Sequence, residues 1–356
     1  MEDIKNVNTE PKDVSEELEE VEVHYKEMSP MRMVVRRFFR SRLSLVGVIM
    51  LVALFAFAFL GPPIMHMFGY QWGEITTDDT GAVKRATSIL EGVKAKDAEG
   101  NEYDVVWFID EEVDINSYAP ASSSHWLGTD EKGMDVFIRL MYGGQVSLTL
   151  GFIVVILETI IGIIMGGISG YFGGIADQII MRIVDVLNCI PTLPILLIAS
   201  VVIDSWPNVE SEDRIYFLML IMTIFGWSGI ARMVRGQILY LREQEFIVAC
   251  EVMGIPTWRR IFKHLVPNIM PQLIVSMTLG LGGIILYEST LSYLGLGIPL
   301  PYAAWGTMIS SSTDPITMAS YPALWVPAGV LIVIAVLAFN FVGDGLRDAM
   351  DPKSKR

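Results

Sequence analysis

The sequence predicts an all-α integral membrane protein with six transmembrane helices. Of its 356 residues, 52% are hydrophobic and only 19% are charged, and the mean hydropathy is +0.46. A soluble domain of ordinary composition carries more charge and less apolar surface. Six apolar runs approach the length that crosses the hydrocarbon core of a bilayer, at 43–60, 146–168, 179–203, 215–231, 269–286 and 325–342.

The distribution of Lys and Arg assigns sides to these spans, because short cytosolic loops are enriched in both residues. Three basic segments precede the first span, follow the fourth and follow the sixth, so a six-span count puts all three on one side. We therefore expect both termini to be cytosolic. The basic residues are Lys26, Arg32, Arg36, Arg37, Arg40 and Arg42, then Arg232, Arg235, Arg242, Arg259, Arg260 and Lys263, and finally Arg347, Lys353, Lys355 and Arg356.

The net charge of −14 is concentrated in two appendages. Residues 1–28 hold ten acids and three lysines, and residues 64–124 hold twelve acids and four bases. Nowhere does a basic surface with interleaved aromatic residues indicate nucleic-acid binding. We divide the chain into an acidic cytosolic tail (1–30), a first transmembrane helix with a basic flank (31–64), an extracellular insert (65–124), a core of five further transmembrane helices (125–345) that contains a cytosolic loop at 235–268, and a cytosolic C-terminal tail (346–356).

The extracellular insert has the pattern of a small β element. The stretches SILEGVKAK and EYDVVWFI are separated by DAEGN, which reads as two strands joined by a glycine-containing turn.

Cysteine and histidine give no sign of a disulfide framework or a metal site. The two cysteines, Cys189 and Cys250, read as small packing residues, and the four histidines lack ligand spacing. The polar, acidic start differs from a signal peptide, so we expect the first span to be an uncleaved anchor.

Small residues and prolines mark two of the predicted helices. Gly162, Gly166 and Gly170 recur every four residues and lay a stripe along one face, which lets another helix approach closely. Pro191 and Pro194 remove backbone donors from the third span and should kink it.

One acidic residue, Glu158, falls near the middle of the second span. A carboxylate at that depth costs at least about 2.5 kcal/mol, so it should face the bundle interior, water or a partner. Two interpretations remain open, a polar group lining a substrate path and a neutralised or hydrogen-bonded carboxyl at a helix interface. We place Asn188 and Glu288 with Glu158 as candidates for a translocation path.

The segment EQEFIVACEVMGIPTWRRIFKHLVPN, at 243–268, is too polar to span and too regular to be a linker. Its first half predicts a helix with Phe246, Ile247, Ala249, Cys250 and Met253 on one face. Gly254 is a helix stop, and Pro256 suits the first turn of a second helix with Trp258, Ile261, Phe262 and Leu265 opposite Arg259, Arg260 and Lys263. A basic amphipathic pair could also be explained as an anchor to anionic lipid.

The order of residues in this segment resembles the cytosolic coupling loop of the membrane subunits of ABC importers. Ala249, Gly254 and Pro267 match the family spacing, whereas Val248, Cys250, His264 and Val266 depart from it. Glu245-Phe246 and the run from Arg260 to Asn268 are similar to the dipeptide and oligopeptide branch.

Further stretches resemble the same branch. They are HWLGTDEKGMDVFIRLMYGGQVSL at 125–148, GYFGG at 170–174, MRIVDVL at 181–187, ESTLSYLGLGIP at 288–299 and NFVGDGLRDAMDP at 340–352. The resemblance covers roughly 31–66 and 125–352 and implies a permease of the type I ABC importer fold.

The resemblance also implies partners and a division of labour. A second, homologous permease subunit, two cytosolic ATPases and an extracellular solute-binding protein would accompany this chain in a bacterial or archaeal cell membrane. The chain has no phosphate-binding loop and no catalytic constellation, so we expect no enzyme activity and no cofactor here, with ATP and magnesium held by the ATPases. The residues that the resemblance assigns to ATPase coupling are Glu245, Ala249, Gly254, Ile255, Pro256, Trp258, Arg259, Arg260, Phe262, Lys263 and Pro267.

Other functions stay open at this point. Close relatives of the branch carry nickel or other small solutes. A secondary transporter would use Glu158 but needs paired ion-binding groups, and a membrane-anchored sensor would use the external insert and the cytosolic loop.

Overall fold

The computed structural model describes residues 30–67, 88–89, 94–96, 102–104, 108–109, 117–123, 125–204, 213–297 and 303–351. Apart from four short strands, these residues form helices and their connections. The N-terminal helices are α2 (Pro30–Arg40), α3 (Arg42–Phe55), a π-helical turn η1 (Ala56–Leu60) and α4 (Gly61–Met67). The central helices are α5 (Val136–Phe172), α6 (Gly174–Cys189), α7 (Thr192–Asp204), α8 (Asp213–Leu241), α9 (Glu245–Val252), α10 (Thr257–Arg259) and the π-helical turn η2 (Arg260–Leu265). The C-terminal helices are α11 (Val266–Leu291), η3 (Ser292–Leu296), α12 (Trp305–Ser310), η4 (Ser311–Thr313), α13 (Pro315–Ser320) and α14 (Pro322–Met350).

Five helical segments of the described residues are long and apolar enough to cross a membrane, and a bent pair makes a sixth if it counts as one span. The five run over Arg42–Met65, Val136–Phe172, Arg214–Leu241, Thr257–Leu296 and Pro322–Met350, and the bent pair is Gly174–Cys189 with Thr192–Ala199. Each contains the core of one apolar run from the sequence, so the all-α, multi-span architecture is confirmed.

The third predicted span is broken, as its prolines indicate. The axes of α6 and α7 differ by 79°. Ile190 precedes Pro191 and has the extended conformation (φ −78°, ψ 125°) that a residue before proline prefers. The break therefore follows from local sequence.

The closest helix pair in the bundle is α5 with α8. A Cβ atom on Gly162 would lie 2.6 Å from Ile230 Cγ2, and one on Gly170 would lie 2.8 Å from the carbonyl oxygen of Arg235. One on Gly166 would collide with the carbonyl oxygen of Ala231. Since the contacts advance in the same direction along both helices, α5 and α8 run parallel, with backbone against backbone.

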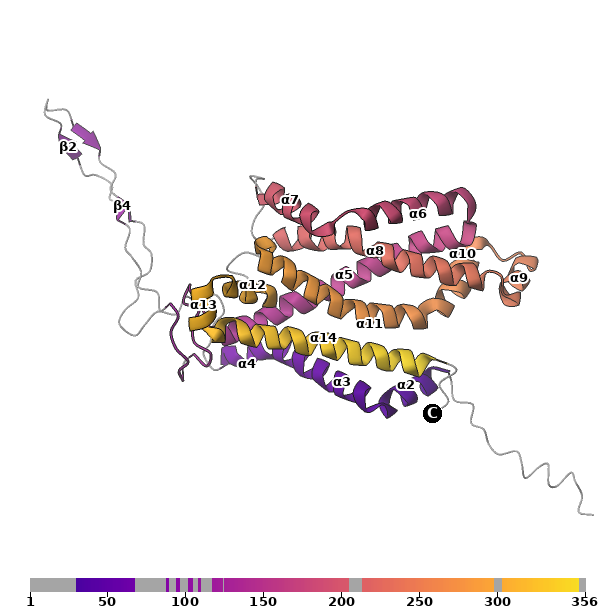
Figure 1. The fold of residues 1–356 in the computed structure, drawn as a ribbon, viewed down its shortest axis with the longest axis horizontal. Helices are drawn as coiled ribbons and strands as arrows, with labels where there is room; N and C mark the ends of the chain where they lie inside the picture. The colour runs from indigo at the N-terminus through magenta and orange to yellow at the C-terminus, as the bar shows by residue number, and fades with distance from the viewer. Residues whose placement is uncertain are drawn as a thin grey trace, which may run out of the picture.

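A second layer packs α14 between α3 and α11 (Figure 1). Two glycines of α14 again allow close approach, since added Cβ atoms would meet Leu279 of α11 at Gly343 and Ser44 of α3 at Gly345. The core between the layers is apolar and includes Leu148, Leu150, Ile285 and Phe339, all almost fully buried.

The described residues of the insert include four short strands, in the two stretches where two longer strands were predicted. Lys94–Lys96 (β2) pairs antiparallel with Glu102–Asp104 (β3), and Ser88–Ile89 (β1) pairs antiparallel with Phe108–Ile109 (β4). The predicted turn at 97–101 lies outside the described residues.

The two ends of the bundle differ in what they carry (Figure 1). We call the end that holds α2, α9, α10 and the last turn of α14 the basic end, because the predicted basic segments gather there. The opposite end holds α4, α12 and α13.

Candidate functional site

The turn at Gly254 lies at the basic end and has the backbone of a Schellman motif. Gly254 adopts φ +70°, a left-handed conformation in which glycine has no steric cost. Its N–H donates to the Glu251 carbonyl oxygen (2.9 Å), and the N–H of Ile255 donates to that of Cys250 (3.0 Å). This pattern ends α9 at Val252, and Pro256 then caps the start of α10.

The first loop helix exposes part of the face on which the sequence groups its apolar residues. Ile247 and Cys250 are buried, but Phe246 and Met253 are exposed to 42% and 68%. Ile247 packs with Ile261 and Leu265 of η2 against Ile238 of α8. The loop is therefore fixed to the bundle by a small apolar cluster.

Four large apolar side chains on both sides of Gly254 point away from this cluster. Their exposed fractions are 84% for Val252, 68% for Met253, 60% for Trp258 and 56% for Phe262. We call these four residues the turn patch. Beside it, Arg259 places its guanidinium over the Trp258 ring, 5.4 Å from the ring centroid, and Lys263 is exposed. An apolar patch rimmed by cations is typical of a protein-binding surface.

Arg260 lies inside the protein, although the periodicity of the segment places it with Arg259 and Lys263. Its Nη1 lies 3.0 Å from a Glu251 carboxylate oxygen, within ion-pair distance, and its Nη2 donates to the Thr257 hydroxyl (3.3 Å). Its guanidinium also lies over the ring of Tyr171 at the end of α5, 5.6 Å from the centroid. The charge of Arg260 is thus directed to α9 and α5.

Other polar contacts join the same region of α5 to α6 and α8. Arg242 donates from Nη1 to the carbonyl oxygens of Gly170 (3.3 Å) and Tyr171 (3.2 Å), which the end of α5 leaves free. Asp177 of α6 accepts two hydrogen bonds from Arg235 of α8 (2.5 and 2.6 Å) and one from Ser169 of α5 (2.5 Å). These contacts tie the ends of α5, α6 and α8 together beside the loop.

The remaining predicted loop residues are distributed around this turn. Glu245 begins α9 and is exposed, as are Ala249 and Pro256, while Ile255 is half-buried. Pro267 is exposed near the start of α11. The expected separate second helix continues through η2 into α11 without a stop.

Glu158 lies at the contact between α5 and α8. It is 9% exposed, and a Cβ atom on Gly226 of α8 would overlap its carboxylate. Gly226 thus leaves room for the acid in the helix interface. Both predicted interpretations of Glu158, a path-lining group and an interface carboxyl, remain compatible with this placement.

The other two candidates for the translocation path have hydrogen-bond partners of their own. Asn188 bridges α6 and α8 beside the break, donating to the Val184 carbonyl (2.6 Å) and accepting from the Ser228 hydroxyl (3.4 Å). Glu288 is 1% exposed and accepts from the Ser147 and Ser292 hydroxyls (3.1 and 2.7 Å).

Glu288 belongs to a buried hydrogen-bond network that also includes Trp305. Ser147 Oγ also accepts from the backbone N–H of the fully buried Trp305 (3.2 Å), and the Trp305 indole donates to the Leu140 carbonyl (2.9 Å). Glu288 therefore ties α5, α11 and α12 together at the opposite end of the bundle.

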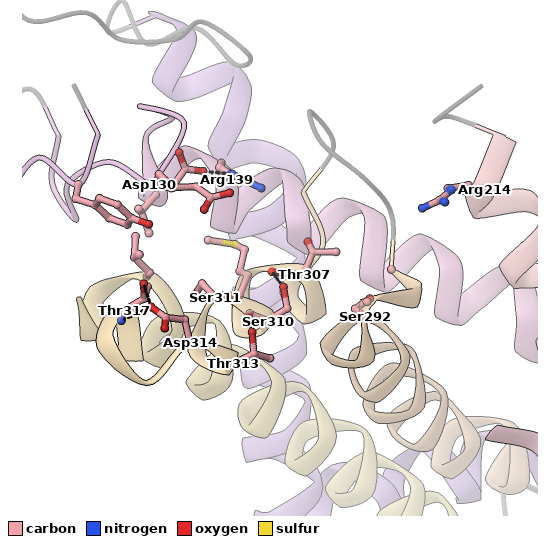
Figure 2. A pocket seen from close by; sticks show the side chains of 17 residues that line it. Asp130, Arg139, Arg214, Ser292, Thr307, Ser310, Ser311, Thr313, Asp314 and Thr317 are labelled. Atoms are coloured by element: carbon pink, nitrogen blue, oxygen red, sulfur yellow. Dashed lines mark hydrogen bonds and ion pairs between the residues drawn. The ribbon is translucent and has the colours of Figure 1, made fainter. Parts of the chain in front are cut away.

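A pocket of about 460 Å³ opens at that opposite end and was missed by the sequence analysis (Figure 2). Its polar lining includes the buried ion pair of Asp130 with Arg139 and a run of hydroxyl residues at 310–313. Ser310, Ser311 and Thr313 donate to carbonyl oxygens three residues earlier, so they present acceptor oxygens. The only hint in the sequence is the SSST run itself.

Asp314 forms part of the pocket wall and caps α13. The hydroxyl and the backbone N–H of Thr317 donate to its carboxylate and hold the pKa of Asp314 below its ordinary value. The cap is therefore intact at neutral pH and is lost only when acid protonates the carboxylate.

The described part of the chain thus combines several candidate spans with an exposed turn at one end of the bundle and a polar pocket at the other. A family model described as the inner membrane component of binding-protein-dependent transport systems matches residues 158–356. A second, the N-terminal transmembrane domain of oligopeptide transport permease C, matches residues 29–79. The chain belongs to the family of binding-protein-dependent transport system inner membrane components.

Relatives with curated names support this assignment over most of the chain. The oligopeptide transport system permease protein OppC of Bacillus subtilis (strain 168) is 43% identical over 68% of this chain and 76% of its own length. The dipeptide permease DppC of the same strain is 41% identical over 67% of this chain and 71% of its own length. OppC of Mycobacterium bovis is 35% identical over 91% of this chain and 94% of its own.

Among solved structures, an inward-facing form of the MetNI methionine ABC transporter is similar, with 20% identity and a TM-score of 0.46 over 60% of this chain and 96% of that one.

Proposed function

We propose that the chain is a membrane-spanning subunit of an ATP-driven importer of dipeptides or oligopeptides. The observation that carries the proposal is the Gly254 turn with its exposed patch, packed against α5 and α8 at the basic end, in a chain whose relatives are named oligopeptide and dipeptide permeases. A second permease subunit, two ATPases and an extracellular solute-binding protein complete the importer. Nickel and other small solutes are less well supported, since the relatives reported above are named for peptides.

In this function the basic end faces the cytosol of a bacterial or archaeal cell, with both termini there. The chain itself hydrolyses no ATP and holds no cofactor. ATP binding closes the ATPase dimer, and the turn patch moves with it because Trp258 and Phe262 insert into an ATPase groove with Arg259 and Lys263 at its acidic rim. The bundle then opens outwards to receive peptide, and hydrolysis resets it.

Reconstitution tests the substrate class directly. The chain and its partner subunits are placed in proteoliposomes, and ATP-dependent uptake is measured for peptides of two to six residues, nickel and a sugar. Peptide uptake that needs both ATP and the binding protein is the expected result. Uptake of nickel or sugar without any peptide would refute peptide import, and uptake without ATPases would indicate a secondary transporter.

Replacement of Tyr171 should weaken coupling between the loop and α5. Tyr171→Leu removes the ring beneath Arg260, a contact of about 0.5–2 kcal/mol, and should lower the peptide imported per ATP hydrolysed severalfold. Tyr171→Phe keeps the ring and should retain the wild-type ratio. The exposed Tyr240 of α8 supplies the matched control, Tyr240→Leu. Equal ratios for Tyr171→Leu and Tyr240→Leu would contradict this role for Tyr171.

Substitution of Glu158 separates its two interpretations. An interface role predicts that Glu158→Gln, which fits the same space beside Gly226, retains assembly and uptake, whereas Glu158→Leu lowers assembly. A path role predicts that both variants assemble and both change uptake. Subunit recovery after purification and initial uptake rates distinguish these outcomes, and wild-type values for both variants would exclude the path role.

A further inference from the structure

Helix α2 lies beside the end of α14 at the basic end, ahead of the first span (Figure 1). Phe38 is buried against α14, where a Cβ atom on Gly345 would lie 3.2 Å from the Phe38 ring. Arg37 donates to the carbonyl oxygen of Asp351 (3.4 Å). Ser41 interrupts the helix and caps α3, accepting from the N–H of Ser44 (3.4 Å). One side of α2 is thus held by the protein.

The rest of α2 combines cations with exposed apolar side chains. Val35 and Phe39 are 52% and 55% exposed, and Arg36 and Arg40 are exposed next to them in sequence. Within the described part of the chain, no acidic side chain lies within ion-pair distance of Arg36 or Arg40. Five arginines fall between residues 32 and 42, so the local charge is strongly positive.

The first span, which begins directly after Ser41, also exposes apolar side chains. Leu43, Val46 and Ile49 on α3 are 62%, 46% and 59% exposed. These α3 residues belong to the most hydrophobic of the candidate spans. Since the span enters the hydrocarbon at Leu43, α2 occupies the depth of the lipid headgroups.

We propose that α2 is an interfacial helix that binds the headgroups of anionic phospholipids through Arg36 and Arg40, with Val35 and Phe39 in the acyl layer. The cytosolic leaflet attracts basic segments next to a span, and an amphipathic helix gains affinity from both charge and buried apolar area. The acidic residues 1–28 are a competing occupant for the arginines, and a truncation described below separates the two occupants. A lipid surface offers anionic headgroups for the arginines and acyl chains for the apolar side chains.

A lipid titration tests the charged half. The full chain is reconstituted in phosphatidylcholine nanodiscs, and bound phosphatidylglycerol is counted by native mass spectrometry as its fraction rises. The double variant Arg36→Gln/Arg40→Gln should bind phosphatidylglycerol roughly 30-fold more weakly, because each arginine near an anionic surface contributes a typical share of affinity. The control Arg182→Gln/Arg232→Gln removes the same charge from exposed positions of α6 and α8 and should leave the titration unchanged.

A depth measurement tests the apolar half. A nitroxide at Phe39→Cys, in a Cys189→Ser background that leaves only the buried Cys250, should collide with oxygen more than with a water-soluble nickel chelate. A label that reacts mainly with the nickel chelate would overturn the proposal. Equal phosphatidylglycerol binding by wild type and the α2 double variant would overturn it as well. The proposal would also fail if the chain bound phosphatidylglycerol preferentially only after residues 1–28 are removed, since the acidic tail would then occupy the arginines of α2.

Discussion

An importer that carries Gly254→Val is expected to hydrolyse ATP while importing little peptide. At φ +70° a β-branched residue costs about 1–3 kcal/mol of backbone strain, whereas a Cβ atom there would meet nothing within 4 Å. The substitution therefore acts on the turn alone and not on packing. Gly254→Pro should have a larger effect, because it also removes the N–H that donates to Glu251. Uptake and ATPase rates are measured on the same proteoliposomes, and the peptide imported per ATP hydrolysed should fall.

Gly254→Asn is the matched control, since asparagine enters the left-handed region more readily than other side chains. It should retain most of the wild-type ratio. Gly236→Ala on α8 adds a Cβ atom in open space and should have no effect. Wild-type uptake with fully substrate-stimulated ATPase activity in Gly254→Val would show that this turn does not transmit the motion.

Enlarging Gly166 is expected to disrupt the α5–α8 pair and with it the folded subunit. Even Gly166→Ala places a carbon against the Ala231 carbonyl oxygen, and the helices must separate at a cost of about 1–3 kcal/mol. Gly166→Leu should prevent recovery of the subunit from membranes. Thermal unfolding in detergent and the yield of monodisperse protein measure both effects.

The neighbouring Gly167 provides a control position for this prediction. A Cβ atom on Gly167 would find its nearest neighbour, Ile238 Cδ1, at 3.8 Å, an ordinary contact. Gly167→Ala should therefore match the wild type in stability, and it shares the helix propensity gain of Gly166→Ala. Equal stability of the two variants would mean that the close approach of α5 and α8 contributes little.

The features that could be predicted from sequence are those that depend on local pattern. Hydropathy located the spans because each must be apolar over its whole length, and Pro191 located the break. Gly254 was a correct helix stop because a Schellman turn needs a residue at positive φ.

The parts that were missed depend on how segments meet. The periodicity of the second loop helix grouped Phe262 with Ile261 and Leu265 and set Arg260 opposite them, but the bundle buries Arg260 with Ile261 and Leu265 and leaves Phe262 exposed. The surroundings of Glu288 and the pocket near Asp314 involve residues far apart in sequence. No periodicity of a single segment reports such contacts.

The 79° break between α6 and α7 gives the bundle a hinge in the middle of a membrane crossing. Neither Pro191 nor Pro194 has a backbone N–H, so the angle between the two helices can change without the loss of a hydrogen bond from either residue. Asn188 holds the α6 side of the hinge to Ser228. We therefore expect any change of this angle to move α7 relative to α5, α6 and α8.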